Sequence, residues 1–444
     1  MTSTSLTGWG RTSFSQARVL QPHHVDEVEQ VYRDERFVIA RGLGRSYGDA
    51  AQLGGGVVLE NRGFNYLGPI AADGTVRLGS GVSFDELLAV ALPLGWFVPV
   101  TPGTRQVTMG GAIGADVHGK NHHVDGSFAS HVRSLQIVTP QGTFEASPER
   151  DPELFWGTFG AMGLTGFVAE LTLALTPVET DQVLVDTDRY DDLAAVMAAM
   201  IEGDANYHYS VAWVDCMTRG KHLGRAILTR GEHATRSEVA EATLRAPRSG
   251  RLRVPLAPPS GLLNRYSVRA FNELWFRSAP RHEAREPQSI QSFFHPLDGV
   301  RDWNLLYGKR GFVQYQFVVP DDGAATIEAV IERLSSAKVA SFLAVLKRFG
   351  PENRGPLSFP RAGWTLALDL PVGPPALARV LDDLDDLVLD AGGRIYFAKD
   401  ARLDATKVNA MYPRLGEFRE LKERLDPRGQ LTSDLARRLH LVGN

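Results

Sequence analysis

Pro102 to His123 reads PGTRQVTMGGAIGADVHGKNHH, and it is the most informative stretch of this chain. A turn signal at Pro102-Gly103 precedes a glycine pair, Gly110-Gly111, and a basic, histidine-rich end. Glycine has no Cβ, so a flat or charged ligand can approach the backbone closely at this pair. We therefore expect this stretch to lie against a bound ligand.

A second glycine-rich segment, RGLGRSYGD from Arg41 to Asp49, follows an apolar run that predicts a strand at Phe37–Ala40. It does not fit the G-x-G-x-x-G motif of a Rossmann nucleotide site, because its third glycine, Gly48, comes one residue late. The next residues, AAQLGGG, run into another predicted strand at Val57–Glu60 rather than into a helix. The segment therefore offers no helix N-terminus to hold a pyrophosphate.

A loop between strands can still bind phosphate through its backbone N–H groups, here assisted by Arg45 or Ser46. The alternative is that Gly42 to Gly48 forms only a tight turn. Two loops that expose their backbone indicate one long, phosphate-bearing cofactor held at two places.

Ordered motifs along the whole chain carry a resemblance to a known family. GLGRSYGD, PGTRQVTMGGAIGADVHGKNHH and ELFWGTFGAMGLTG (Glu153 to Gly166) resemble the FAD-binding half of the vanillyl-alcohol oxidase superfamily, with its PCMH-type FAD-binding domain. More closely, the chain is similar to the polyprenyl-phosphoryl ribose 2′-oxidases of that superfamily. The likeness runs from Leu6–Thr12 to Ser433–Leu439 and includes FHPLD, QYQFVVP, PLSFP and YFAKD, at 294–298, 314–320, 356–360 and 396–400.

This resemblance implies an α+β fold of two domains, like that of vanillyl-alcohol oxidase. One domain binds FAD, and the other binds substrate on a large antiparallel sheet covered by helices. We expect the FAD-binding domain at 1–177 and the substrate domain at 178–394. A helical C-terminal segment, 395–444, is expected to return to the FAD-binding domain.

Local patterns predict the main elements of both parts. Ser83 begins a helix that runs to Leu92, with Glu86 completing a capping box. Residues 230–263, rich in arginine, proline and glycine, predict a long mobile connection. Residues 395–400 form an apolar run typical of a strand. Further strands are expected at 75–78, 135–138, 143–145, 209–214, 312–319, 342–346 and 365–370, and helices at 191–201, 324–336 and 375–389.

The composition is that of a globular protein with a buried core. The chain has 444 residues, 43% of them hydrophobic and 23% charged, which is enough for two domains. A net charge of −4 gives no indication of nucleic-acid binding. The single cysteine, Cys216, excludes disulfides within the chain. No signal peptide or long apolar run is visible, so we expect a cytoplasmic protein or one peripheral to the cell membrane.

The resemblance implies that FAD is the cofactor and that it is held non-covalently. The residues implied to contact it come from both glycine-rich loops, from the third motif and from the apolar run near the C-terminus. They are Gly42, Gly44, Arg45, Ser46, Tyr47, Gly48, Pro102, Gly103, Thr104, Thr108, Gly110, Gly111, Ala112, His118, Gly119, Asn121, Gly163, Thr165, Gly166, Tyr396 and Lys399.

The histidines of the first stretch allow two interpretations. His118 and His122 have the spacing of two metal ligands on a helix, but no third ligand is evident and we predict no metal site. The simpler interpretation is that they only cap loops. The resemblance instead implies that His118 lies beside the flavin and Lys120 in the substrate pocket. There a cation would favour a substrate phosphate or polarise a hydroxyl.

Two further lysines are singled out. Lys399 lies in an apolar run, and a lysine that faces a core is costly unless it is paired or deprotonated. It can instead face solvent or pair with Asp400. The resemblance places Lys399 at the flavin, as a catalytic residue with His118 and Lys120, where its charge would stabilise the reduced cofactor. It also implies that Lys347 points into the substrate pocket and that Phe349 shapes it.

Gln314 and Gln316 share one face of a predicted strand, because side chains alternate along a strand with period two. Spacing alone leaves open whether that face is outward or whether it binds the hydroxyls of a sugar. The resemblance favours the pocket for both glutamines. It also implies that Trp213 lines the cavity, while Tyr47 is a candidate to cover the flavin or the substrate.

The chain departs from the family pattern at three pocket positions. Ala367 stands where a cysteine is common, Thr365 where asparagine is familiar, and Phe294 where a tyrosine is known. Each change shrinks or de-polarises the pocket wall. Hydride transfer to the flavin does not need the cysteine, so we expect the chemistry to survive and the sugar or its lipid carrier to be open to variation.

These inferences predict an FAD-dependent oxidase acting on the 2′-hydroxyl of a polyprenyl-phosphoryl-β-D-ribose. The product is the 2′-keto sugar, the first half of epimerisation to the arabinose donor for cell-wall arabinan. The resemblance implies a separate NADH-dependent reductase as partner, and a peripheral membrane contact through 230–263. The alternatives are an alditol or aldonolactone oxidase, a flavin oxidase of a soluble ribosyl metabolite, and a non-catalytic flavin-binding scaffold.

Overall fold

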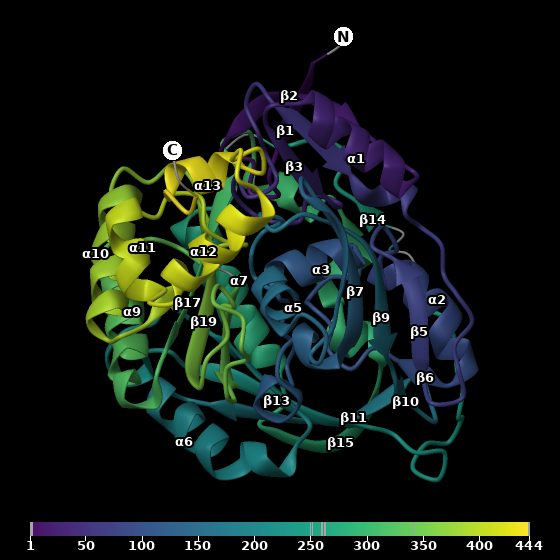
Figure 1. The fold of residues 1–444 in the computed structure, drawn as a ribbon. Helices are drawn as coiled ribbons and strands as arrows, with labels where there is room; N and C mark the ends of the chain where they lie inside the picture. The colour runs from purple at the N-terminus through teal and green to yellow at the C-terminus, as the bar shows by residue number, and fades with distance from the viewer. Residues whose placement is uncertain are drawn as a thin grey trace.

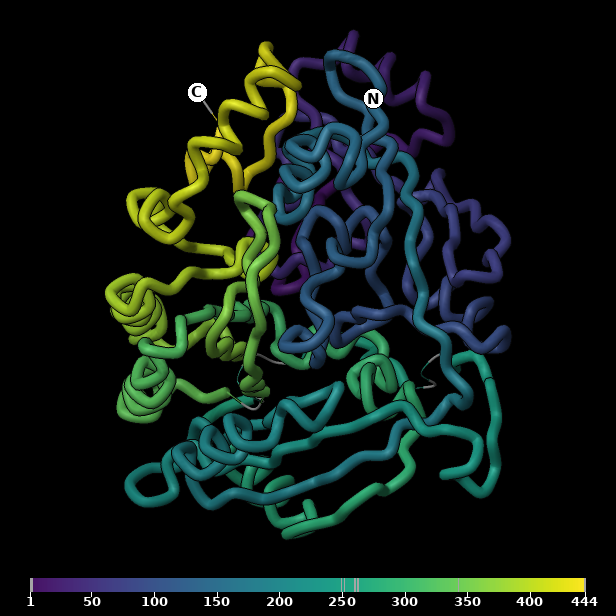
Figure 2. The backbone as a smooth tube through the Cα atoms, turned by 60° about the horizontal axis from the view of Figure 1, so that its bottom comes forward, coloured from purple at the N-terminus to yellow at the C-terminus, as the bar shows by residue number. Residues whose placement is uncertain are grey.

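A computed structural model describes residues 3–248, 250, 252–258, 261, 263–341 and 343–442 of the chain. Two four-stranded sheets lie in the N-terminal part, and one eight-stranded antiparallel sheet lies in the middle of the sequence. In Figure 2 the teal middle part of the chain, which contributes strands to the large sheet, crosses the bottom of the view below the blue N-terminal part, and the yellow C-terminal helices lie at the top left. This arrangement confirms the predicted α+β, two-domain fold.

The first small sheet has the order β1-β2-β4-β3, and the second has the order β5-β9-β7-β8. In the first sheet, β4 pairs in parallel with both β2 and β3, which is why the connections there are long. The strands are β1 (Thr4–Thr7), β2 (Phe14–Leu20), β3 (Val38–Arg41), β4 (Val57–Glu60), β5 (Thr75–Gly79), β7 (Val132–Thr139), β8 (Gly142–Ala146) and β9 (Phe167–Ala174). A short ribbon of β6 (Trp96–Phe97) and β10 (Thr176–Pro177) accompanies them.

The helices of the N-terminal part are short and serve mainly as connections. As predicted, Ser83 caps α2, and Glu86 returns a hydrogen bond to the backbone N–H of Ser83. The capping box fixes the start of the helix, and Leu87 and Leu88 are buried below it. The helices of this part are α1 (Val25–Asp34), α2 (Phe84–Ala91), α3 (Met109–Ala115), α4 (His122–Asp125) and α5 (Pro152–Thr158).

The large sheet has the order β15-β11-β13-β12-β18-β19-β17-β20. All eight residues of β17 are buried. Helices cover one face of this strand, α9 packs on α10, and α10 contacts β17 (Figure 1). The strands are β11 (Gln182–Tyr190), β12 (Tyr209–Val214), β13 (Ala226–His233), β15 (His282–Ser289), β17 (Phe312–Val319), β18 (Ala344–Phe349), β19 (Gly363–Pro371) and β20 (Arg394–Ile395).

Helices between these strands complete the middle of the chain, and three more follow β20. They are α6 (Leu193–Gly203), α7 (Arg265–Ser278), α8 (Ile290–Phe294), α9 (Ala325–Ser336), α10 (Leu377–Asp390), α11 (Ala405–Met411), α12 (Leu415–Leu425) and α13 (Asp434–Arg438). The strands and helices predicted in both parts are confirmed within a few residues, with Phe342 of one predicted strand lying outside the described residues.

The C-terminal helices lie beside the N-terminal strands in Figure 1. Leu431 forms a parallel bridge with Val38, and the Gln430 side chain donates to the carbonyl of Tyr32 at 2.7 Å. Arg438 pairs with Asp49 at 2.7 Å. These contacts support the predicted return of the C-terminal segment, while the boundaries at 177 and 394 stay predictions.

Two predictions about local structure need correction. Residues 230–263 form a long connection only in part, because Arg230–His233 continue β13, and Leu252–Arg253 form β14, which pairs with β16 (Val300–Arg301). Among the described residues between His233 and α7, β14 is the only helix or strand. Ser249, Arg251, Pro259, Ser260 and Leu262 of that range lie outside the described residues. The apolar run 395–400 is not a strand beyond Ile395. It bends into a turn in which the N–H of Lys399 donates to the carbonyl of Tyr396 at 2.9 Å.

Over the described parts of the chain, no helix is both long enough and apolar enough to cross a membrane.

Candidate active site

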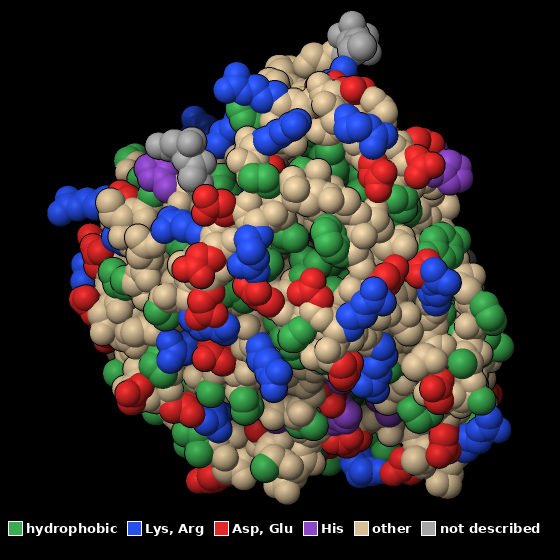
Figure 3. Space-filling view, in the orientation of Figure 1, with side chains coloured by type: hydrophobic (Ala, Val, Ile, Leu, Met, Phe, Trp, Pro, Cys, Tyr) green, Lys and Arg blue, Asp and Glu red, His purple; other side chains and the backbone are tan. Residues whose placement is uncertain are grey.

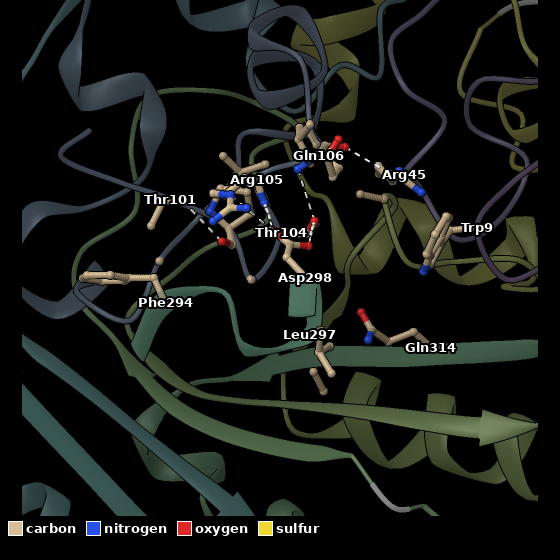
Figure 4. Close-up of a pocket in the computed structure, with 18 of the residues that line it drawn as sticks. Trp9, Arg45, Thr101, Thr104, Arg105, Gln106, Phe294, Leu297, Asp298 and Gln314 are labelled. Atoms are coloured by element: carbon tan, nitrogen blue, oxygen red, sulfur yellow. Dashed lines mark hydrogen bonds and ion pairs between the residues drawn. The ribbon is translucent and has the colours of Figure 1, made fainter. Parts of the chain in front are cut away.

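A cavity of about 940 Å³ lies between the two glycine-rich segments and one face of the large sheet. Figure 4 shows its wall, with Arg45 and Trp9 at one end, Phe294 at the other and Gln314 on the strand below. The size matches a large ligand, since cavities for drug-sized molecules measure roughly 300–1,000 Å³.

The glycine loop at 42–48 is fixed by close backbone contacts. Gly44 has a φ of +64°, a conformation that favours glycine. A Cβ on Gly42 would lie 2.3 Å from the Thr108 hydroxyl, and one on Gly48 would lie 2.0 Å from the carbonyl oxygen of Asp400. The N–H of Tyr47 also donates to the carbonyl of Ala398 at 2.9 Å. The loop is therefore pressed against two other segments of the cavity wall.

The glycine pair lies in a helix, α3, which the sequence analysis treated as a loop. Thr108 caps this helix by accepting from the N–H of Gly111 at 3.2 Å. A Cβ on Gly110 would lie 2.7 Å from the side-chain nitrogen of Asn61, which donates to the carbonyl of Ser80. The pair thus allows α3 to approach the neighbouring loop as well as the cavity.

Most of the predicted site residues line this cavity, although they come from segments far apart in the sequence. Those at its wall are Gly42, Gly44, Arg45, Ser46, Tyr47, Pro102, Gly103, Thr104, Thr108, Gly110, Gly111, His118, Gly119, Lys120, Gly163, Gly166, Trp213, Phe294, Gln314, Gln316, Lys347, Ala367, Tyr396 and Lys399. Their contacts with a cofactor or substrate stay predictions.

Six predicted residues do not line the cavity. Asn121 donates to the carbonyl of Pro99 at 2.8 Å, and the hydroxyl of Thr365 donates to the carbonyl of Phe317 at 2.8 Å. Phe349 packs behind His118, with ring centres 4.8 Å apart. These side chains support the wall from behind. The six are Gly48, Ala112, Asn121, Thr165, Phe349 and Thr365.

His118 is almost fully buried at the cavity wall, against the rings of Phe349, Phe359 and Tyr396. Burial holds the pKa of its imidazole well below the usual value, and nearby lysines lower it further. The ring is therefore neutral. Its Nε2 lies 3.0 Å from the side-chain nitrogen of Gln316 and accepts from that amide, which leaves the proton on Nδ1.

The Nδ1 atom of His118 is buried and has no hydrogen-bond partner among the residues that the structure describes. A buried donor without a partner is costly, so a bound group with an acceptor at this place would satisfy it. This orphaned donor and the glycine cradle both fit an FAD isoalloxazine and its phosphates. His122 instead accepts from the N–H of Gly350 at 3.1 Å, and the described residues contain no group of three metal ligands.

Three partly buried lysines face the cavity together. Burial, with a contribution from the nearby charge of Lys347, lowers the pKa of Lys120 to about 7. Burial also lowers the pKa of Lys347 to about 7, with a contribution from Lys399. Lys120 lies 4.0 Å from the centre of the Phe293 ring and donates to the carbonyl of that residue. Like charges this close favour an anion in the cavity.

Lys399 lies with its Nζ 4.0 Å from the centre of the Tyr47 ring. Burial lowers its pKa to about 8, and the carboxylate of Asp369 opposes that shift. It faces the cavity rather than solvent, and Asp400, the partner considered from the sequence, instead pairs with Arg438 at 2.9 Å. A lysine in this state can carry a positive charge near neutral pH and lose it readily.

Asp369 is a residue of this site that the sequence analysis missed. It is fully buried, and the Gln314 amide donates to it. Burial raises the pKa of its carboxyl to about 7. The signal was available in the sequence, because Asp369 is two residues beyond Ala367 on the same strand and shares its face.

A contact between the two halves was also missed. Asp298 accepts from the Thr104 hydroxyl at 2.6 Å and from the N–H of Arg105 at 2.7 Å (Figure 4). A hydrogen bond of 2.8 Å joins the Thr101 hydroxyl to His295. The FHPLD motif is therefore joined to the PGTR turn by hydrogen bonds at the cavity wall. Trp9, under the Arg45 guanidinium at 4.0 Å, and Phe293 also line the cavity and were not predicted.

Residues 16–146 match a family described as an FAD binding domain, and residues 368–439 match one described as D-arabinono-1,4-lactone oxidase. Together with the cavity, these matches define an FAD-dependent oxidoreductase of the vanillyl-alcohol oxidase type.

The chain is 42% identical to the decaprenylphosphoryl-β-D-ribose oxidase of Mycolicibacterium smegmatis, over 99% of this chain and 98% of that protein. It belongs to the decaprenylphosphoryl-β-D-ribose oxidase family, which confirms the resemblance drawn from the sequence. It is also 25% identical to an alditol oxidase of a Streptomyces species, over 98% of this chain and 99% of that protein.

Proposed function

We propose that the protein oxidises the 2′-hydroxyl of a polyprenyl-phosphoryl-β-D-ribose to the 2′-keto sugar, with FAD held non-covalently. The observation that carries this proposal is the group of three partly buried lysines that faces one cavity together with Gln314 and Gln316. Cations suit a phosphodiester, and amides suit sugar hydroxyls. An uncharged alditol would leave the lysines without an anion, so it is the second candidate.

The residues of the glycine loop, of α3 and of the PGTR turn would hold FAD, which supplies a two-electron acceptor for the hydride of a carbinol carbon when bound. The protein contributes orientation and charge. Lys120 and Lys347 hold the substrate phosphate, and the two glutamines orient the ribose. A positive charge at Nζ of Lys399 would stabilise the negative charge that the bound cofactor gains on reduction.

A separate NADH-dependent reductase is proposed to consume the keto sugar and deliver arabinose, which would make this reaction the first half of an epimerisation for cell-wall arabinan. The support is the relation to the decaprenylphosphoryl-β-D-ribose oxidase of Mycolicibacterium smegmatis.

Anaerobic mixing with a polyprenyl-phosphoryl ribose tests the reaction. We expect the flavin absorption to bleach and mass spectrometry to find a product two hydrogens lighter, because hydride and proton both leave the substrate. The 2-deoxyribose analogue, which lacks the reacting hydroxyl, should leave the flavin oxidised. Bleaching by xylitol or an aldonolactone but not by the phosphoryl ribose would assign the protein to the second candidate.

Release of the cofactor tests how FAD is held. His118 is packed on three aromatic rings and keeps its Nε2 in a hydrogen bond with Gln316. We expect the purified protein to be yellow and to release all its FAD into the supernatant after heat or acid precipitation. Flavin that stays with the polypeptide, on a peptide containing His118 or a neighbour, would show a covalent link instead.

A further inference from the structure

Helix α7 carries large apolar side chains on its outside. Its buried side chains, Val268, Asn272 and Phe276, recur every four residues and mark the inner face. A surface helix normally turns its apolar residues towards the core, so an apolar outer face calls for a partner. The exposed fractions are 69% for Tyr266, 45% for Phe271, 71% for Leu274 and 49% for Trp275.

The sequence around α7 is strongly basic. Residues 245–281 contain eight arginines and one acidic residue, Glu273, although the whole chain has a net charge of −4. Glu273 is already paired with Arg225 at 2.7 Å and with Arg277. On the face shown in Figure 3, by contrast, basic and acidic side chains are interspersed. Two more apolar side chains, Leu252 and Leu256, are 68% and 80% exposed in the same segment.

The outer face of α7 is continuous with the active-site cavity. Phe271 and Trp275 lie parallel, with ring centres 6.2 Å apart and planes 7° from each other, and both line the cavity. Because each is also about half exposed, the cavity meets the surface at this helix. Leu297 and Trp303 add further apolar side chains to the cavity wall.

We propose that α7 and the described arginines before it, Arg245, Arg248 and Arg253, seat the enzyme on the surface of an anionic lipid bilayer, with Leu274 inserted among the acyl chains. Aromatic and aliphatic side chains flanked by arginines are the composition of helices that lie in a membrane interface. A second copy of the chain would bring two such basic surfaces together, so repulsion disfavours a dimer through this face.

The proposal rests on the proposed function for its purpose, since a prenyl chain left in the bilayer could enter the cavity between Phe271 and Trp275. It names the lipid surface as a partner of the same site. Attraction between basic residues and anionic headgroups would add to the binding that the inserted apolar side chains provide.

Co-sedimentation of the holoenzyme with vesicles tests the docking surface. We expect binding to vesicles of equal parts phosphatidylcholine and phosphatidylglycerol, and binding at least about tenfold weaker to phosphatidylcholine alone. Leu274→Asp should weaken binding to the mixed vesicles by about tenfold or more, because it removes an inserted side chain and adds a negative charge. The matched control is Ile201→Asp on α6, where the original side chain is 59% exposed and far from the arginine-rich segment in sequence.

Equal binding to both vesicle types, equal binding by Leu274→Asp and the wild type, or an equal loss in Ile201→Asp would each overturn the proposal. So would a wild-type dimer, found by sedimentation, that Leu274→Asp dissociates without any vesicle binding.

Turnover separates this proposal from the proposed function. Leu274 does not line the cavity, so Leu274→Asp should oxidise a water-soluble, short-prenyl substrate at the wild-type rate. It should be about tenfold slower with a decaprenyl substrate embedded in the mixed vesicles. An equal loss with both substrates would show a structural defect and overturn the docking role. If the wild type oxidises neither substrate, the proposed function fails, while the vesicle binding is judged on its own result.

Discussion

Lys399→Ala is expected to slow reduction of the flavin by substrate by about 10²-fold or more, the scale for loss of a positioned charge at a reacting group. The lysine faces the cavity, and its Nζ lies 4.0 Å from the centre of the Tyr47 ring. The carboxylate of Asp369 opposes the lowering of its pKa by burial and so favours the charged form. Stopped-flow spectroscopy under anaerobic conditions measures the rate directly. The FAD content and the melting temperature should change little, because Asp369 can take up a proton when its partner is lost.

The pH dependence gives a second readout of the same role. Burial lowers the pKa of Lys399 to about 8, so its positive charge is present below that pH and is lost as the pH rises above it. The wild-type reduction rate should therefore fall above about pH 8, and the alanine variant should lack this fall. The exposed Lys309, changed to alanine, is the control and should behave as wild type. Reduction of the Lys399→Ala flavin at the wild-type rate would leave the residue with a structural role only.

Ala367→Cys is expected to convert an inert pocket wall into one that captures an electrophile. Ala367 lies on β19 between Gln316 of β17 and Val345 of β18, and it faces the cavity. Nitroaromatic inhibitors that trap the family's cysteine should then form a covalent adduct during turnover, detected by intact mass. Oxidase activity should stay within about tenfold, since one added sulfur costs at most about 1–3 kcal/mol of overpacking.

The wild-type protein supplies the control for that adduct. Its only thiol, Cys216, is fully buried outside the cavity, and burial raises the pKa of the thiol well above its usual range. A thiol is reactive only as the thiolate, so Cys216 should remain unmodified. Inhibitor mass on Cys216, or a cysteine variant that turns over without an adduct, would show that the Ala367 side chain does not line the pocket beside the flavin.

The sequence predicted the elements whose signals are local. The capping box at Ser83 and Glu86 fixed one helix, and the alternation at Gln314 and Gln316 correctly placed both amides on one face of a strand. The strand predicted at 395–400 was wrong, because an apolar composition is shared by strands and by buried turns. Its turn is held by contacts with the glycine loop, which local composition does not record.

The site was harder to predict than the fold for a related reason. Asp369 and Asp298 look like ordinary surface carboxylates when they are read alone. Asp369 is buried against β17, where the Gln314 amide donates to it. Asp298 is bound by the PGTR turn, almost 200 residues earlier in the chain. Helix α3 was missed because its glycines lower helix propensity, and its cap at Thr108 with close packing on Asn61 compensates.

Three short segments, 42–48, 101–111 and 396–400, close on one another at the wall of the cavity, and the last of them follows the other two by more than 280 residues. The carbonyls of Ala398 and Asp400 are the surfaces against which the glycine loop is pressed. A nascent chain still emerging from the ribosome thus has no finished seat for the dinucleotide. All three segments can hold a dinucleotide only after 396–400 has been synthesised and packed, so its capture follows the folding of the middle of the chain rather than of the first glycine-rich segments alone.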